Sequence, residues 1–270
     1  MDNNNIFPVI VCLAKNEYNY IEEFVKYHLA LGFKHIILYD NQDVPETYSK
    51  ILEKYLDKMT IFHIAGNNYE HAIQDIILNH FSQVLSPQIK NTVTHVAHID
   101  IDEYITLKKH PNIIEFIKEY IKGDCSGIGI SWKFFGSSGH TTYSTEPITK
   151  RFTKCDSKPD KHIKTLCNLH HLVGFINPHQ VLLKEGYIKD TNGNILNSPF
   201  NYNFNNCLDV IQINHYKCKT FHEYKIIRMR GSAGKIQVPY DLKLLEKDFK
   251  AYDLNEDEDL TAKQFYESII

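Results

Sequence analysis

The first hundred residues alternate between short apolar runs and an amphipathic helical pattern. Apolar runs of strand length cover Pro8 to Leu13, His35 to Tyr39, Met59 to His63 and Val93 to Ile99. After the first run, apolar residues from Ile21 to Leu29 recur at the i, i+3, i+4, i+7 spacing, which predicts a helix that Gly32 ends. Strands and helices at this spacing form right-handed β-α-β units. The pattern therefore predicts an α/β fold with a mostly parallel sheet.

Two further helices are expected between the later strands of this half. One begins at Pro45 and runs to about Leu56. The other runs from about Tyr69 to Val84, and Pro87 is expected to end it because proline cannot continue a helix.

The regular alternation of strands and helices ends after about Gly136. Shorter strand-like runs follow, separated by loops, at Ile148 to Thr153, Ile163 to Cys167, Gln180 to Leu183 and Asp209 to Ile213. Helices are predicted from about Thr220 to Met229, ended by Gly231, and from about Leu242 to Tyr252. No internal repeat or low-complexity linker separates the two halves, so residues 1–270 are predicted to form a single domain.

The composition is that of an ordinary globular protein, and it limits the kinds of molecule that the protein is expected to bind. The net charge is only -3 and no basic stripe appears, which argues against nucleic acid as the main partner. No stretch reaches the roughly 20 apolar residues that span a bilayer, and Met1 to Asn5 carry no apolar signal region. We therefore expect a cytoplasmic protein or an excised catalytic domain. The six cysteines form no C-x-x-C pair and are expected to be reduced, buried thiols.

The strongest chemical signal is the segment from His98 to Tyr104, which reads His-Ile-Asp-Ile-Asp-Glu-Tyr. If the strand continues through it, Asp100 and Asp102 point the same way at the carboxyl end of the fourth strand, where open α/β sheets bind ligands. Two carboxylates on one face repel each other, and a bound divalent cation explains their placement. Hard oxygen ligands suit Mg²⁺ or Mn²⁺, which keep positions open for phosphate oxygens.

Polar residues also follow the first two strands. Lys15, Asn16 and Glu17 come after the first strand, and Asp40 ends the second. Residues at this edge can meet a base and a ribose, and the amino end of the next helix favours a phosphate. The alternatives are a helix cap at Asn16 and an ordinary turn residue at Asp40.

Taken in order, these motifs resemble glycosyltransferase family 92 and its family 2-like relatives. The resemblance covers residues 8 to about 231, through Ala14-Lys15-Asn16-Glu17, Glu22-Glu23-Phe24, Tyr27-His28, Leu31-Gly32-Phe33, Ile37 to Asn41, Ile99 to Tyr104, Trp132 to His140, Asn214-His215-Tyr216, Lys219-Thr220 and Glu223. It implies a GT-A-type fold: a twisted, mostly parallel sheet flanked by helices, with a smaller mixed region. Residues of about 1–136 would be the nucleotide-sugar half, and about 137–270 the acceptor-side half.

The resemblance further implies that His215 is a third metal ligand. A neutral imidazole suits manganese better than magnesium, so Mn²⁺ is expected and Mg²⁺ is the alternative. A structural histidine is the competing interpretation. Trp132, the only tryptophan, would offer a flat face to a sugar ring or anchor the core. Lys164 and Lys219 would offset diphosphate charge or be ordinary solvated lysines.

The expected reaction is metal-dependent transfer of a sugar from a nucleotide diphosphate, UDP above all, to a hydroxyl of a glycan or glycoprotein. The resemblance suggests inversion, which needs a base near the acceptor. The admissible candidates are Glu103, His140, Glu146 and Glu223. Two other functions stay open: a non-catalytic nucleotide-sugar or glycan-binding module, and a metal-dependent nucleotidyltransferase or phosphodiesterase. A second copy of the chain, forming a homodimer, is a further candidate partner.

Overall fold

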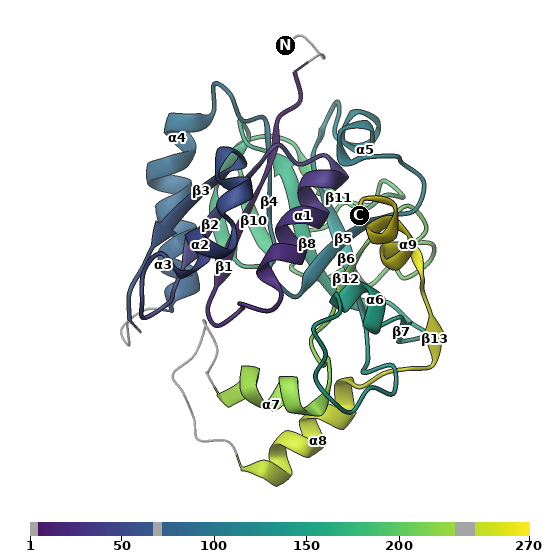
Figure 1. Ribbon diagram of the computed structural model, residues 1–270. Helices are drawn as coiled ribbons and strands as arrows, with labels where there is room; N and C mark the ends of the chain where they lie inside the picture. Colours follow the sequence, from purple (N-terminus) through teal and green to yellow (C-terminus); the bar gives the residue numbers. More distant parts are fainter. Residues whose placement is uncertain (1–4, 67–71, 230–240) are drawn as a thin grey trace.

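A mixed sheet of nine strands forms the centre of the protein in the computed structural model, which describes residues 5–66, 72–229 and 241–270 (Figure 1). The order across the sheet is β3 (Met59–His63), β2 (His35–Asp40), β1 (Pro8–Ala14), β4 (His95–His98), β8 (Asp160–Asn168), β6 (Cys125–Phe134), β12 (Ile211–His215) and β5 (Glu103–Leu107), and β11 (Tyr187–Lys189) pairs with β6. Most strand pairs are parallel, which confirms the predicted α/β fold.

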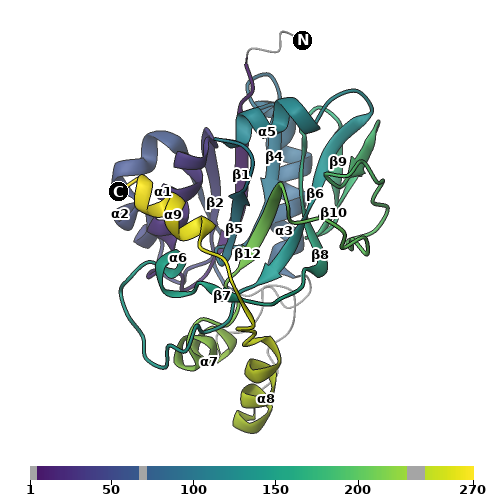
Figure 2. The ribbon, with the colours of Figure 1, turned by 90° about the vertical axis from the view of Figure 1, so that its right-hand side faces the viewer.

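Helices cover both faces of this sheet because alternate strand residues point to opposite sides. Along β1, Ile10 and Cys12 belong to one hydrophobic cluster, and Val9 and Val11 belong to the other. Figure 2 shows the two helical layers on either side of the strands. The first layer contains α1 (Ile21–Leu31), α2 (Thr47–Ile51), α5 (Ile113–Tyr120) and α9 (Thr261–Ser268), and the second contains α3 (Ile73–His80) and α4 (Ser86–Ile89).

The register of the parallel strands brings their carboxyl ends to one edge. Ala14, the last residue of β1, lies opposite Asp40, the last residue of β2. Val11 lies opposite His98 at the end of β4, and the backbone N–H of Ile99 donates to the Val11 carbonyl at 3.2 Å. The polar segments that follow β1, β2 and β4 therefore share this edge of the sheet.

The remaining elements lie around the second half of the sheet. They are α6 (Ile148–Arg151), β7 (Lys154–Cys155), the hairpin of β9 (Leu172–Asn177) and β10 (Gln180–Leu183), α7 (Phe221–Met229), α8 (Leu242–Tyr252) and β13 (Asp257–Glu258), which pairs with β7. In Figure 1, α7 and α8 lie below the sheet, on the side where β1 ends.

The strand predicted from Ile148 to Thr153 is wrong, because this segment begins with the short helix α6. The cause is a distant carboxylate. Glu23 of α1 is buried and accepts hydrogen bonds from the backbone N–H groups of Ile148 (2.7 Å) and Thr149 (3.0 Å). A carboxylate that satisfies the first N–H groups of a helix stabilises it. A tertiary contact therefore overrides the strand pattern of the local sequence.

The third predicted helix extends beyond its expected C-terminal end. It continues through a π-helical turn (Phe81–Leu85) and α4 to Ile89. Pro87 lies in the first turn of α4, directly after the π-helical turn, and its missing N–H does not break the helical path. Pro87 therefore continues the helical path, and the expectation that it ends the helix is wrong. The predicted start near Tyr69 lies outside the described residues.

The second predicted helix is interrupted at Leu52. It divides into α2 (Thr47–Ile51) and a 3₁₀ helix (Glu53–Lys58). The helices predicted over 220–229 and 242–252 are confirmed as α7 and α8, although the expected stop at Gly231 lies outside the described residues.

All six cysteines lie in the described parts of the chain, and each is a buried free thiol, as predicted. Within residues 5–66, 72–229 and 241–270, no helix has the length and apolar character needed to cross a membrane. The division into a nucleotide-side half and an acceptor-side half stays a prediction.

Candidate active site

The two aspartates of the D-x-D segment lie in a tight turn between β4 and β5. β4 ends at His98 and β5 begins at Glu103, so Asp100 and Asp102 are outside both strands. The turn is closed twice: the Glu103 N–H donates to the Asp100 carbonyl at 3.0 Å, and the Asp100 N–H donates to Glu103 Oε2 at 2.9 Å. The prediction that the aspartates share a strand face is therefore wrong, although it places them correctly at the carboxyl edge.

Strand β12 brings His215 to this turn from the other half of the chain. His215 lies opposite Glu103 in the antiparallel pairing of β12 with β5, and the Tyr216 N–H donates to the Asp102 carbonyl at 2.8 Å. His215 Nε2 is consequently 3.6 Å from Asp102 Oδ2. Adjacent ligands of one six-coordinate ion with bonds of about 2.1 Å lie about 3 Å apart. The imidazole and the carboxylate are thus close to the separation that a shared ion requires.

Aromatic packing holds the His215 ring. The ring stacks on Phe134 at 5.1 Å between centroids and meets Trp132 edge-on at 4.3 Å. Burial lowers the pKa of His215, and Asp102 only partly opposes this effect. The imidazole is therefore neutral near pH 7, the form that binds a metal ion. Its Nδ1 is buried and has no hydrogen-bond partner within the described residues.

Lys164 joins the acidic turn from β8. Its Nζ lies 2.9 Å from Asp100 Oδ2 and 3.3 Å from Glu103 Oε2, and its side chain is 1% exposed. Burial acts to raise the pKa of Asp100, but the charges of Lys164 and His98 and the hydrogen bond from Lys164 together outweigh it, and the pKa falls below the ordinary value. Burial raises the pKa of Glu103, and the charge of Lys164 opposes this shift. Across the described residues, no three His, Cys, Asp or Glu side chains are grouped closely enough to hold a metal ion.

The predicted nucleotide-side residues lie at the ends of β1 and β2. Asp40 is 1% exposed, and its carboxylate accepts a hydrogen bond from the Gln42 backbone N–H at 2.8 Å. Burial raises the pKa of Asp40. Lys15 is 3.9 Å from the Asp43 carboxylate, and the Glu17 N–H donates to the Tyr48 hydroxyl at 2.9 Å.

Asn16 is exposed and adopts a left-handed backbone conformation with φ of 55°. Helix α1 begins only at Ile21, with Tyr20 as its N-cap, so Asn16 does not cap it.

Two residues expected at the ligand surface are buried instead. Trp132 is 8% exposed, and its ring stacks on His162 at 5.0 Å between centroids. It therefore anchors the wall of the site and leaves little open face for a sugar ring. Lys219 is 1% exposed, and its Nζ donates to the Tyr216 carbonyl at 3.1 Å. This bond holds the chain that follows His215, so Lys219 is not a solvated lysine.

The candidate bases do not gather at the Asp102–His215 pair. Glu103 has no exposed surface, and its carboxylate accepts from the Asp100 N–H at 2.9 Å and lies 3.3 Å from Lys164 Nζ. Glu223 is 3% exposed and forms a two-pronged ion pair with Arg151 at 2.8 and 3.2 Å. His140 hydrogen-bonds to the Arg151 carbonyl through Nε2 at 2.9 Å. Glu146 is exposed, and its carbonyl accepts from Arg151 Nε at 3.0 Å. A base role for His140 or Glu146 stays a prediction.

Lys217 is a residue of this site that the sequence motifs did not indicate. Its ammonium lies over the Tyr252 ring, 3.0 Å from the centroid, and 5.7 Å from the Phe134 centroid. Burial lowers its pKa to about 8, and Arg228 adds to this shift. The sequence feature that could have indicated Lys217 is its position two residues after His215, just beyond the end of a strand.

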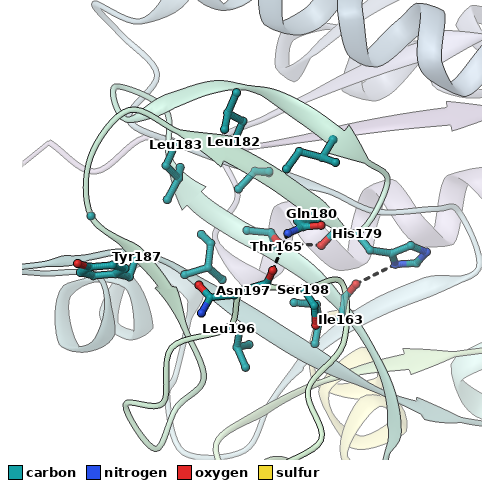
Figure 3. A pocket seen from close by; sticks show the side chains of 14 residues that line it. Ile163, Thr165, His179, Gln180, Leu182, Leu183, Tyr187, Leu196, Asn197 and Ser198 are labelled. Atoms are coloured by element: carbon teal, nitrogen blue, oxygen red, sulfur yellow. Dashed lines mark hydrogen bonds between the residues drawn. The ribbon is translucent and has the colours of Figure 1, made fainter.

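A cavity of about 220 Å³ opens beneath the β9–β10 hairpin (Figure 3). Ile163 and Thr165 line it from β8, whereas Lys164 between them contacts Asp100 on the other side. Leu182 is 49% exposed and forms part of the rim. His179 connects the cavity to the site, because its ring meets Trp132 edge-on at 5.0 Å and its Nδ1 bonds to the Ile163 carbonyl at 2.9 Å.

The mostly parallel α/β sheet carries an acidic turn and a histidine at its carboxyl edge, which is where open α/β sheets bind their ligands. The sequence model of glycosyltransferase family 92 matches residues 7–217, and the chain belongs to this family. The predicted resemblance and enzyme class are thereby confirmed.

Three solved structures are similar to parts of the chain. TarS from S. aureus is 15% identical, with 61% of this chain and 28% of that chain covered and a TM-score of 0.38. The mannosyltransferase Ktr4p from S. cerevisiae is 12% identical, and the match covers 49% of this chain and 41% of that chain with a TM-score of 0.30. Core-mannan synthase A from Aspergillus fumigatus, in its Mn/GDP form, is 8% identical. The match covers 62% of this chain and 61% of that chain with a TM-score of 0.32. The chain thus spans less than two thirds of each of these three chains. No curated protein matches the chain.

Proposed function

We propose that this glycosyltransferase takes a sugar from a nucleotide diphosphate, with UDP as the carrier, and passes it to a hydroxyl of a glycan or glycoprotein. We further propose that Asp100, Asp102 and His215 hold a manganese ion. The observation that carries the proposal is the 3.6 Å approach of His215 Nε2 to Asp102 Oδ2, which a strand pairing between distant parts of the chain creates.

The donor set fits a divalent ion of this kind. Two carboxylates and a neutral imidazole suit Mn²⁺, and Mg²⁺ is the alternative because it also accepts carboxylate oxygens. A bound ion would neutralise the diphosphate and stabilise it as a leaving group. The neighbouring Lys217 adds a cation on the His215 side, beside the Phe134 ring on which His215 stacks.

A donor-turnover assay tests this function. The purified protein is incubated with uridine and guanosine diphosphate sugars, with and without glycan acceptors, in Mn²⁺ or in EDTA. We expect release of the nucleoside diphosphate in Mn²⁺ and none in EDTA. Donor binding without turnover would instead indicate a binding module, and pyrophosphate or nucleoside monophosphate as the product would indicate a nucleotidyltransferase or phosphodiesterase.

The substitution Asp40→Asn should raise the Kd for UDP about tenfold, because it removes the charge of a carboxylate that we place against the ribose or base. Asparagine retains the oxygen that accepts from the Gln42 N–H, so the local turn is preserved. Calorimetric titration with UDP and Mn²⁺ measures the effect. The control is Asp57→Asn, at an exposed aspartate that precedes β3 at the opposite edge of the sheet. Equal UDP affinity in the two variants would place the nucleotide elsewhere.

We place the acceptor on the side of residues 137–270, with the cavity beneath the β9–β10 hairpin as its binding site. The cavity has apolar walls, polar groups from Gln180 and Ser198, and a link through His179 to the rings around Trp132. The rim substitution Leu182→Asp should raise the acceptor KM severalfold and leave donor hydrolysis unchanged. Val84→Asp, at a residue that is 48% exposed on the second helical layer, is the control. An unchanged acceptor KM would exclude the cavity.

A further inference from the structure

We propose that Lys164 competes with the metal ion for the Asp100 carboxylate, and that its ammonium is transferred to the donor phosphate when the ion takes its place. Lys164 would then couple metal binding to donor binding. This inference rests on the proposed function, since it requires a divalent ion and a diphosphate at the same edge of the sheet.

The first argument is the position of the ammonium. Its Nζ lies 2.9 Å from Asp100 Oδ2, a distance typical of a charge-assisted hydrogen bond. Asp100 is one of the two carboxylates that the proposed ion needs. An ion bound to Asp100 and the ammonium would both lie within a few ångströms of the same oxygens. Their mutual repulsion is relieved only if the ammonium leaves Asp100.

The second argument is that Lys164 has a carboxylate that can retain it. Glu103 Oε2 is 3.3 Å from Nζ, so the ammonium bridges two acids. The two acids differ in burial, since the side chain of Asp100 is 38% exposed and that of Glu103 is 0% exposed. Glu103 Oε2 also accepts from the Asp100 N–H, which holds it at the base of the turn. Glu103 is therefore the fixed partner, and Asp100 is the partner that faces the ligands.

The third argument concerns where the ammonium goes. Lysine has a flexible stem with three donors on its terminal nitrogen, and it can turn about a retained contact with Glu103. A diphosphate bridged to the ion brings negative charge next to Asp100. The ammonium can then exchange the carboxylate for a phosphate oxygen without becoming unpaired. Metal alone should therefore bind weakly, and metal and UDP should bind with positive coupling, which is reciprocal.

Manganese titration of three proteins tests the proposal: the wild type, Lys164→Met, and the double variant Lys164→Met with Glu103→Gln. Without UDP, both variants should bind Mn²⁺ about tenfold more tightly than the wild type, because the competing cation is gone. The factor by which UDP strengthens Mn²⁺ binding should fall about tenfold. Trp132, the only tryptophan, reports on the site by fluorescence quenching, because its ring lies 4.3 Å from that of His215 and 6.0 Å from Lys164 Nζ.

The matched control is Lys189→Met, which removes a lysine paired with Asp124 at 2.8 Å on β11 and should leave both quantities unchanged. If Lys164→Met does not fold because it isolates Glu103, the double variant decides, since it removes both buried charges. Unchanged or weaker Mn²⁺ binding in the folded variants, with unchanged coupling, would overturn the proposal and leave Lys164 a structural brace. Failure of the proposed function would give a different result, because Mn²⁺ would then not quench Trp132 fluorescence in the wild type, even with UDP present.

Discussion

Replacement of Asp102 by asparagine should lower donor turnover at least about a hundredfold while the protein stays folded. The substitution preserves shape and removes the charge that would hold the ion next to His215 Nε2. A metal ion supplies several kcal/mol of transition-state stabilisation, and each 1.4 kcal/mol changes the rate about tenfold. Steady-state release of the nucleoside diphosphate in Mn²⁺, with circular dichroism to verify the fold, measures the effect.

The control for this substitution is Asp57→Asn. Asp57 is an exposed aspartate that precedes β3, at the edge of the sheet opposite to the acidic turn. Its replacement should leave turnover within about twofold of the wild type, as is usual for exposed positions away from a site. Full activity of Asp102→Asn would exclude this carboxylate as a metal ligand.

Replacement of Glu223 by glutamine should lower the free energy of unfolding by about 3–5 kcal/mol, because it leaves the buried guanidinium of Arg151 without its counter-ion. The carboxylate also accepts from the Tyr20 hydroxyl at 2.8 Å and the Thr220 hydroxyl at 2.6 Å. Urea denaturation measures the loss. The exposed pair Lys118–Glu115 provides the control, since Glu115→Gln should cost less than about 0.5 kcal/mol.

The stabilisation that the Glu223 carboxylate provides depends on pH. Burial acts to raise the pKa of Glu223, but the hydrogen bonds from Arg151, Thr220 and Tyr20 outweigh it and lower the pKa. The stabilisation is therefore full above the unfolded value of about 4.3 and is lost as the pH falls through the lower folded value. Turnover per folded molecule should change little in Glu223→Gln. A hundredfold loss of turnover with unchanged stability would instead identify Glu223 as the base.

Local pattern was sufficient to predict the first three strands and the first helix. The apolar runs and the helical periodicity from residue 8 to 63 are decided by neighbours in sequence, and β1, α1, β2 and β3 lie where they were predicted. The strand assigned to 148–153 failed because a carboxylate of α1, Glu23, stabilises the start of a helix there. Such a contact joins residues that are far apart in sequence and leaves no periodic signal.

The site was predictable in its chemistry and less so in its geometry. The spacing of Asp100 and Asp102 indicated acidic ligands at a strand end, but the reversal of the chain into β5 depends on hydrogen bonds to Glu103. The approach of Lys164 depends on the antiparallel pairing of β8 with β4. The burial of Trp132 follows from the ring of His162, which β8 places against it.

Crystals soaked with Mn²⁺ and UDP provide the most direct test of the central claim that this edge of the sheet binds a metal–diphosphate complex. Anomalous diffraction should show one manganese ion with carboxylate oxygens of Asp100 and Asp102 and the Nε2 atom of His215 within about 2.0–2.3 Å, and with a diphosphate oxygen in the same coordination sphere. A UDP molecule bound at the end of β1 and β2 without manganese at this turn, or manganese bound only elsewhere, would contradict the account.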